Sequence, residues 1–131
     1  MNPLSPTLVK RCWIGVSGFG IALLFYLSLM PQPPEISVEH GDKFGHVLAY
    51  AVLMYWWAQL FVSTRQRLWL AAGLTGLGIA IEYVQDWTGL RTFDYFDMLA
   101  DAVGVTIGGI LAACTPNLLV LARRFGNHRP G

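Results

Sequence analysis

Four long apolar segments dominate the sequence and constrain its fold more than any other feature. They cover residues 12–30, 44–62, 68–86 and 98–122. A helix needs about 20 residues, within a range of roughly 17–25, to cross the hydrocarbon core of a bilayer. Charged residues make up only 13% of the 131-residue chain, about half the share of an ordinary soluble domain. The sequence therefore predicts one all-α domain, an integral membrane bundle of four transmembrane helices.

Basic and acidic residues fall on opposite sides of this predicted bundle. An even number of crossings brings seven basic residues to one side: Lys10, Arg11, Arg65, Arg67, Arg123, Arg124 and Arg129. The other side receives two basic residues and all eight acids: Lys43, Arg91, Glu35, Glu39, Asp42, Glu82, Asp86, Asp94, Asp97 and Asp101. The positive-inside rule makes the first side cytoplasmic, so we expect both termini in the cytoplasm.

Polar residues recur on one face of three predicted helices, close to the acidic side. They are Lys43, His46 and Tyr50 on the second helix, Glu82 and Gln85 on the third, and Asp97 and Asp101 on the fourth, with Arg91 and Asp94 in the loop above. At a rise of 1.5 Å per residue, His46, Glu82 and Asp101 reach a similar depth. Ionisable groups at such depth are costly and usually functional, although they also pair for packing. We therefore predict a ligand-binding polar pocket open to the periplasmic side, with a structural ion-pair network as the alternative.

Glu82 poses the sharpest question within this set, because its own helix contains no neighbouring cation. If it is buried, it must be protonated or must pair with Lys43, Arg91 or His46. Asp97 has a second interpretation, as the N-cap of the fourth helix.

Small residues and a proline give the fourth segment further structure. Gly104 and Gly108 form a GxxxG pair, which lets helices approach closely within one chain or between two chains. A homo-oligomer through these glycines is thus one expectation. Pro116 lies inside the same apolar run and is expected to kink or end its helix.

The motif residues together resemble the VanZ-like family of small bacterial membrane proteins. The matching blocks are Asp42-Lys43-x-x-His46-x-x-x-Tyr50, Glu82-x-x-Gln85, Arg91-x-x-Asp94-x-x-Asp97 and Gly104-x-x-x-Gly108, within about residues 20–115. The family commonly has asparagine at the position of Asp101, so this chain adds a carboxylate there. The resemblance implies a multi-pass protein of the bacterial cytoplasmic (inner) membrane. It also implies a contribution to teicoplanin-type glycopeptide resistance or to homeostasis of the cell envelope.

Three classes of function follow from these residues. In the first, Lys43, His46 and Arg91 hold the phosphate or carboxylate of a membrane lipid or lipid-linked amphiphile, while the carboxylates contact its hydroxyls or amines. In the second, Glu82, His46 and Asp101 are catalytic candidates acting on a lipid-linked phosphate substrate, with a metal-dependent variant. A small ion-coupled transporter is the third and ranks last, because no inverted repeat is visible.

Several other classes are not expected. The near balance of acids and bases leaves no global basic surface for nucleic acid. Two isolated cysteines form no Cys/His cluster of the zinc-finger type. We predict no bound cofactor and assign no metal site.

Overall fold

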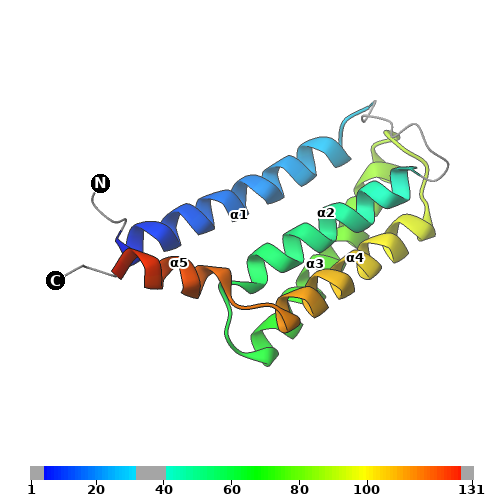
Figure 1. Ribbon diagram of the computed structural model, residues 1–131. Coiled ribbons are helices and arrows are strands. Elements are labelled where there is room, and N and C mark those ends of the chain that lie inside the picture. The colour runs from blue at the N-terminus through cyan, green and yellow to red at the C-terminus, as the bar shows by residue number, and fades with distance from the viewer. Residues whose placement is uncertain (1–4, 32–40, 128–131) are drawn as a thin grey trace.

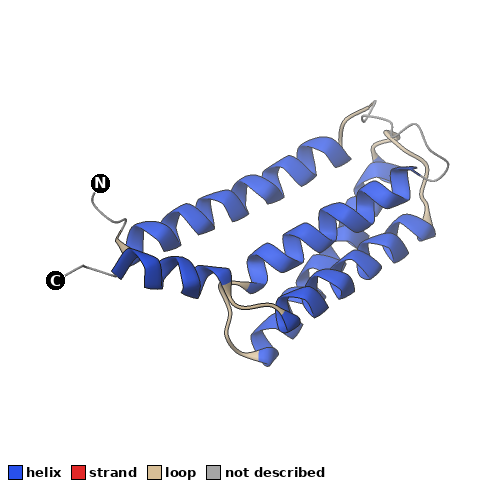
Figure 2. Ribbon diagram, in the orientation of Figure 1, coloured by secondary structure: helices blue, strands red, loops and turns tan. Residues whose placement is uncertain are grey.

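The computed structural model describes residues 5–31 and 41–127, and this part of the chain folds into helices joined by short loops, with no strand (Figure 2). The helices are α1 (Pro6–Ser28), α2 (Gly41–Ala58), α3 (Thr64–Trp87), α4 (Tyr95–Cys114) and α5 (Leu118–Asn127). The predicted all-α class is confirmed. Glu35, Glu39, Arg129 and both chain termini lie outside the described residues.

Three of the helices, α1, α3 and α4, are long and apolar enough to cross a membrane, which indicates a membrane protein. The helix α2 is not one of these three, because its first two turns contain Asp42, Lys43 and His46. The four long helices run alternately in opposite directions (Figure 1). The predicted polar faces therefore meet at one end, where α2 and α4 begin and α3 ends.

The centre of the molecule is the contact between α2 and α4, which is the most extensive helix pair. Gly104 and Gly108 make it possible, since a Cβ atom at either position would collide with a backbone carbonyl of α2, at Val47 and Ala51 respectively. The GxxxG pair is therefore used inside the chain. The predicted homo-oligomer is untested and would need a different surface.

The helix α1 lies at the edge of this arrangement (Figure 1). Only 6% of its apolar 18-residue stretch is buried inside the molecule, against 39% for the corresponding stretch of α4. Two contacts hold its ends. Trp13 stacks on Trp56 of α2 with ring centroids 3.9 Å apart, and the backbone oxygen of Ser28 accepts a hydrogen bond from α3.

The apolar run over residues 98–122, predicted as one helix with a kink or an end at Pro116, forms two helices, so the predicted interruption at Pro116 is confirmed. It divides into α4 and α5 at Thr115–Asn117, because Pro116 has no amide hydrogen to donate and its ring clashes with the preceding turn. The helix α5 then turns to pack against α1 (Figure 1).

The other predicted bounds also shift, mainly at helix starts, where capping residues set the limits. The helix α1 begins at Pro6 instead of residue 12, because Ser5 Oγ accepts a hydrogen bond from the amide of Leu8 at 3.2 Å. The helix α2 covers 41–58 instead of 44–62, and a short turn follows it. Ser63 then caps α3.

Candidate functional site

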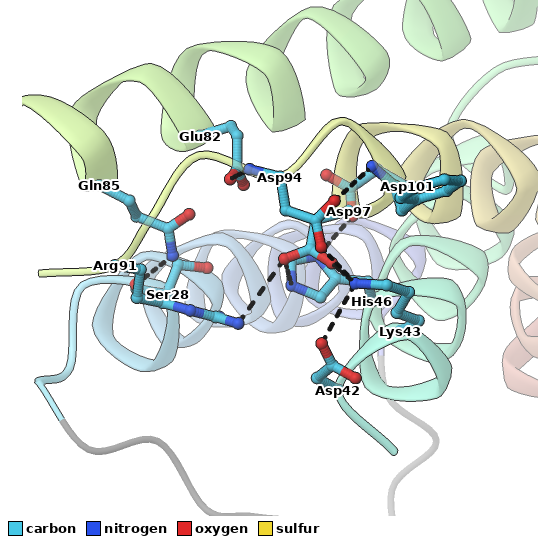
Figure 3. Close-up of polar contacts among 11 residues, drawn as sticks. Ser28, Asp42, Lys43, His46, Glu82, Gln85, Arg91, Asp94, Asp97 and Asp101 are labelled. Carbon is cyan, nitrogen blue, oxygen red and sulfur yellow. Dashed lines mark hydrogen bonds and ion pairs between the residues drawn. The ribbon is translucent and has the colours of Figure 1, made fainter. Parts of the chain in front are cut away.

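The structure brings the predicted ionisable residues together at the end of the bundle where α2 and α4 begin (Figure 3). We call this group the polar cluster; it consists of Asp42, Lys43, His46, Glu82, Arg91, Asp94, Asp97 and Asp101. Asp97, Asp101 and Glu82 are each only 3% exposed. The side chains of Glu82, Asp97 and Asp101 thus lie inside the helix bundle, whereas those of Asp42 and Asp94 are 48% and 36% exposed.

The ammonium group of Lys43 is fully engaged by carboxylates. Its Nζ lies 2.6 Å from Asp94, 2.7 Å from Asp97 and 3.2 Å from Asp42. An ammonium has three hydrogens to donate, so these contacts use its whole capacity. Lys43 therefore acts as an organiser that joins the start of α2 to the start of α4.

Asp97 connects the cations of the polar cluster to one another. One oxygen, Oδ1, accepts from Lys43, while Oδ2 lies 3.6 Å from both His46 Nε2 and the guanidinium of Arg91. On the other side of the imidazole ring, His46 Nδ1 lies 2.8 Å from Asp101 Oδ1. His46 is thereby held between two carboxylates, and the carboxylate of Asp101 fixes the hydrogen on Nδ1.

Glu82 has a partner that the sequence did not predict. Its Oε1 accepts a hydrogen bond from the backbone amide of Asp94 at 2.7 Å. Among the described residues no cation lies within ion-pair distance of Glu82, so none of Lys43, Arg91 and His46 is its direct partner. The residue pattern could not indicate this hydrogen bond, because any residue except proline can supply a backbone amide.

The loop that presents Arg91 and Asp94 has a defined exit from α3. Gly89 adopts a positive φ of 67°; its amide donates to Asp86, and the next amide, of Leu90, donates to Gln85. This is a Schellman ending, in which glycine satisfies the last carbonyls of a helix. Asp94 then caps α4 by accepting from the amide of Phe96 at 2.8 Å. Asp97, which had been the alternative cap, lies within the first turn.

Two predicted ligand-binding residues lie beside the polar cluster and make other contacts. Gln85 is 1% exposed, and its amide nitrogen donates to the backbone oxygen of Ser28 at 2.6 Å, which fastens α1 to α3 (Figure 3). Tyr50 is also 1% exposed and packs where Gly104 of α4 leaves room for it. Both are buried in helix contacts.

Gly78 of α3 also shapes the site. A Cβ atom at this position would meet the carboxylate of Asp101, with its Cγ at 3.0 Å. The missing side chain of Gly78 thus makes room for the side chain of Asp101.

The charges of the polar cluster do not balance. Five carboxylates (Asp42, Glu82, Asp94, Asp97, Asp101) face two permanent cations, Lys43 and Arg91, with His46 as a third when protonated. Counted formally, with every carboxyl group ionised, the difference is three negative charges, or two with a protonated imidazole. At the loop, the hydrogen bonds from Lys43 and from the Phe96 amide hold the pKa of Asp94 below its usual value.

The cluster has no obvious metal-binding geometry. Within residues 5–31 and 41–127, no group of three or more histidine, cysteine, aspartate or glutamate side chains is arranged to hold an ion.

Comparison with known proteins gives one relative and no assigned activity. The chain is similar to an uncharacterized protein of Schizosaccharomyces pombe, C11E3.10, with 30% identity over 109 residues. The match covers 80% of this chain and 64% of the yeast protein, which is less than two thirds of that protein's length. No family model matches the chain, and no solved structure matches it.

Proposed function

We propose that this protein binds the polar head group of an amphiphile in the membrane, using the polar cluster as its site. One observation supports the proposal most strongly: charged side chains from three helices and a loop converge at one end of the helix bundle and pair there. Burying ionisable groups in such surroundings is costly and is usually associated with function. This convergence supports the first of the three function classes, the binding of a membrane lipid or lipid-linked amphiphile.

Arg91 is the cation best placed to receive an anionic group of the ligand. A guanidinium has five hydrogens to donate, and among the described residues Arg91 makes one ion pair, to Asp97 at 3.6 Å. Its side chain is 25% exposed. Phosphate and carboxylate groups match the planar fork of arginine well. We therefore assign the contact with the anionic group of the ligand to Arg91, and Lys43 and His46 supply further positive charge within the polar cluster.

The excess of carboxylates points to hydrogen-bond donors on the same ligand. The Oε1 atom of Glu82 and the Oδ1 atom of Asp101 have protein partners, and each carboxylate has a second oxygen with capacity to accept. Hydroxyl or amine groups of a head group would supply such donors and offset the negative charge. A phosphate joined to a sugar or an amino alcohol has both features.

In the same proposal α2 is the fourth span. The charged residues that lower its hydropathy are those paired with α4 and the α3–α4 loop, so their charges are compensated inside the bundle. Both termini are then cytoplasmic and the polar cluster faces the periplasm of a bacterium, in the inner membrane. Through the VanZ-like resemblance, the ligand is a lipid-linked envelope precursor or an acylated glycopeptide, and the role is in teicoplanin-type resistance.

Native mass spectrometry of the detergent-extracted protein tests the proposal. We expect an amphiphile to co-purify with the wild type and to be lost from Arg91→Ala, whereas Asp86→Ala, which removes an exposed charge outside the polar cluster, retains it. Retention of the same amphiphile by Arg91→Ala, or no bound amphiphile in the wild type, would contradict it.

An enzyme acting on the same ligand is the second candidate, favoured by the Asp101–His46 hydrogen bond. A carboxyl group hydrogen-bonded to an imidazole is a common acid–base pair. In this alternative Glu82 or Asp101 serves as the general base or acid with His46 as its partner, and Asp101→Asn would abolish turnover of a lipid-linked phosphate while amphiphile binding persists. Loss of binding together with turnover would favour the binding role instead.

A further inference from the structure

The end of the molecule opposite the polar cluster carries exposed cations from three different helices. Lys10 and Arg11 lie on α1, Arg65 on the first turn of α3 and Arg124 on α5, and all four are exposed. We call these four residues the basic end. The acids that the structure describes all lie at the other end, so none of them neutralises these cations.

The helix α5 contributes to the basic end in a fixed orientation. The amide of Leu118 donates to Gln59 Oε1 at 2.9 Å, and Asn117 Nδ2 donates to the backbone oxygen of Gln59 at 3.0 Å. Asn117 Oδ1 also accepts from the amide of Val120 at 3.0 Å, which caps the helix. These hydrogen bonds fasten the start of α5 to the end of α2.

The first side chains of α5 are one buried residue between two partly exposed ones, which point to different sides of the helix. Leu119 is 3% exposed, whereas Leu118 and Val120 are each 38% exposed. The cationic residue Arg124 follows on the last turn. The helix is the most amphipathic of the five. An amphipathic helix with apolar and basic residues is typical of the interface between acyl chains and head groups.

We propose that α5 and the basic end form a binding surface for anionic phospholipid head groups in the adjacent leaflet. The position of the surface supports a lipid as the partner, because α1, α3 and α4, the helices long enough to cross a membrane, begin or end beside it. Charge complementarity supports an anionic lipid, since four exposed cations meet no described acid.

This surface is distinct from the polar cluster in charge and in the way its cations are used. The cations of the polar cluster are paired with carboxylates, whereas among the described residues those of the basic end make no ion pair. Each unpaired Lys or Arg near an anionic surface favours binding by about fivefold. The inference does not rest on the ligand proposed for the polar cluster.

A lipid-competition measurement tests the proposal. The full chain in detergent is mixed with equal amounts of phosphatidylglycerol and phosphatidylcholine, and native mass spectrometry gives the ratio of the two bound lipids. We expect the wild type to prefer phosphatidylglycerol and the preference to fall as salt increases. In the variant K10Q/R11Q/R65Q/R124Q the ratio should fall by about tenfold or more, with single variants each falling by up to about fivefold.

Two control variants distinguish lipid binding at the basic end from lipid binding at the polar cluster. The charge-conserving variant K10R/R11K/R65K/R124K should retain the preference, as should Arg91→Ala, which alters only the polar cluster. Equal binding of the two lipids by the wild type would overturn the proposal. So would an unchanged ratio in the glutamine variant, or a preference abolished by Arg91→Ala alone.

Discussion

The two ends of the bundle both contain polar side chains, but they satisfy them in different ways. At the polar cluster, side chains pair with one another: Lys43 with Asp94 and Asp97, and His46 with Asp101. At the opposite end, polar side chains mostly bond to the backbone. Arg67 donates to the carbonyls of Phe61 and Ala112, both at 3.1 Å.

This difference separates the polar side chains that the fold requires from those that a ligand would explain. A side chain that bonds to a carbonyl at a helix end replaces a hydrogen bond that the helix cannot make for itself. Arg67 and Gln59 are explained by that need. The polar cluster contains more carboxylates than its cations can neutralise, and helix ends do not require them. A bound ligand would explain this excess of carboxylates.

The largest expected effect comes from disrupting the contact between α2 and α4, on which both ends of the bundle depend. Gly104→Leu places a side chain against the backbone of α2 near Val47, where a carbonyl cannot move aside. We expect no folded protein in fluorescence-detected size-exclusion chromatography. Gly76→Leu is the matched control, because a Cβ there meets nothing within 4 Å. A folded Gly104→Leu protein would show that α2 and α4 pack differently.

Asp97→Ala should be the most damaging change within the polar cluster. It leaves Lys43, His46 and Arg91 without their shared acceptor, and breaking a buried ion pair typically lowers the free energy of unfolding by about 3–5 kcal/mol. Thermal unfolding in detergent measures the change, with the exposed Asp86→Ala as control. Equal unfolding temperatures for the two variants would mean that the network contributes little.

Arg67→Ala tests the opposite end and should cost less. The variant removes hydrogen bonds to two carbonyls, for an expected loss of about 1–3 kcal/mol. The same unfolding assay measures it, with the exposed Arg65→Ala as control. Because Arg67 serves the fold alone in this account, amphiphile retention should not change once the protein is folded. Loss of the amphiphile from folded Arg67→Ala would remove the distinction between the ends.

The smallest effect is a pH dependence at Asp94. Its pKa lies below the usual value of 3.8, so its pairing stabilises the fold above the ordinary pKa, and this stabilisation is lost as pH falls through the lower folded-state pKa. Between about pH 5 and about pH 2, the wild type should therefore lose more thermal stability than Asp94→Asn. Asp86→Asn should follow the wild type. Parallel curves for wild type and Asp94→Asn would contradict this role of the Lys43 contact.

Sequence reasoning could predict the residues of the polar cluster but not all of their partners. Helical periodicity placed Lys43 and His46 on one face and Asp97 and Asp101 on another, and the structure joins these faces. Glu82 and Gln85 lie at the same end of the bundle. Their bonds go to the backbone of Asp94 and Ser28, and such contacts depend on tertiary packing that no residue pattern specifies.

The course of the chain after Pro116 shows the same limit. The missing amide hydrogen of proline predicts an interruption, and the interruption is present. The direction of α5 depends on the joint between Asn117 and Gln59, two residues 58 positions apart in the sequence. Local preferences therefore predicted where the helix breaks, and long-range hydrogen bonds decided where it goes.

The most direct test of the central claim is an experimental structure of the protein in nanodiscs made from its native membrane. The account predicts density for a lipid head group at the polar cluster, with an anionic group within hydrogen-bond distance of Arg91 and hydroxyl or amine groups near Glu82 and Asp101. Acyl chains lying against Glu82, with head groups kept away from Arg91, would contradict it.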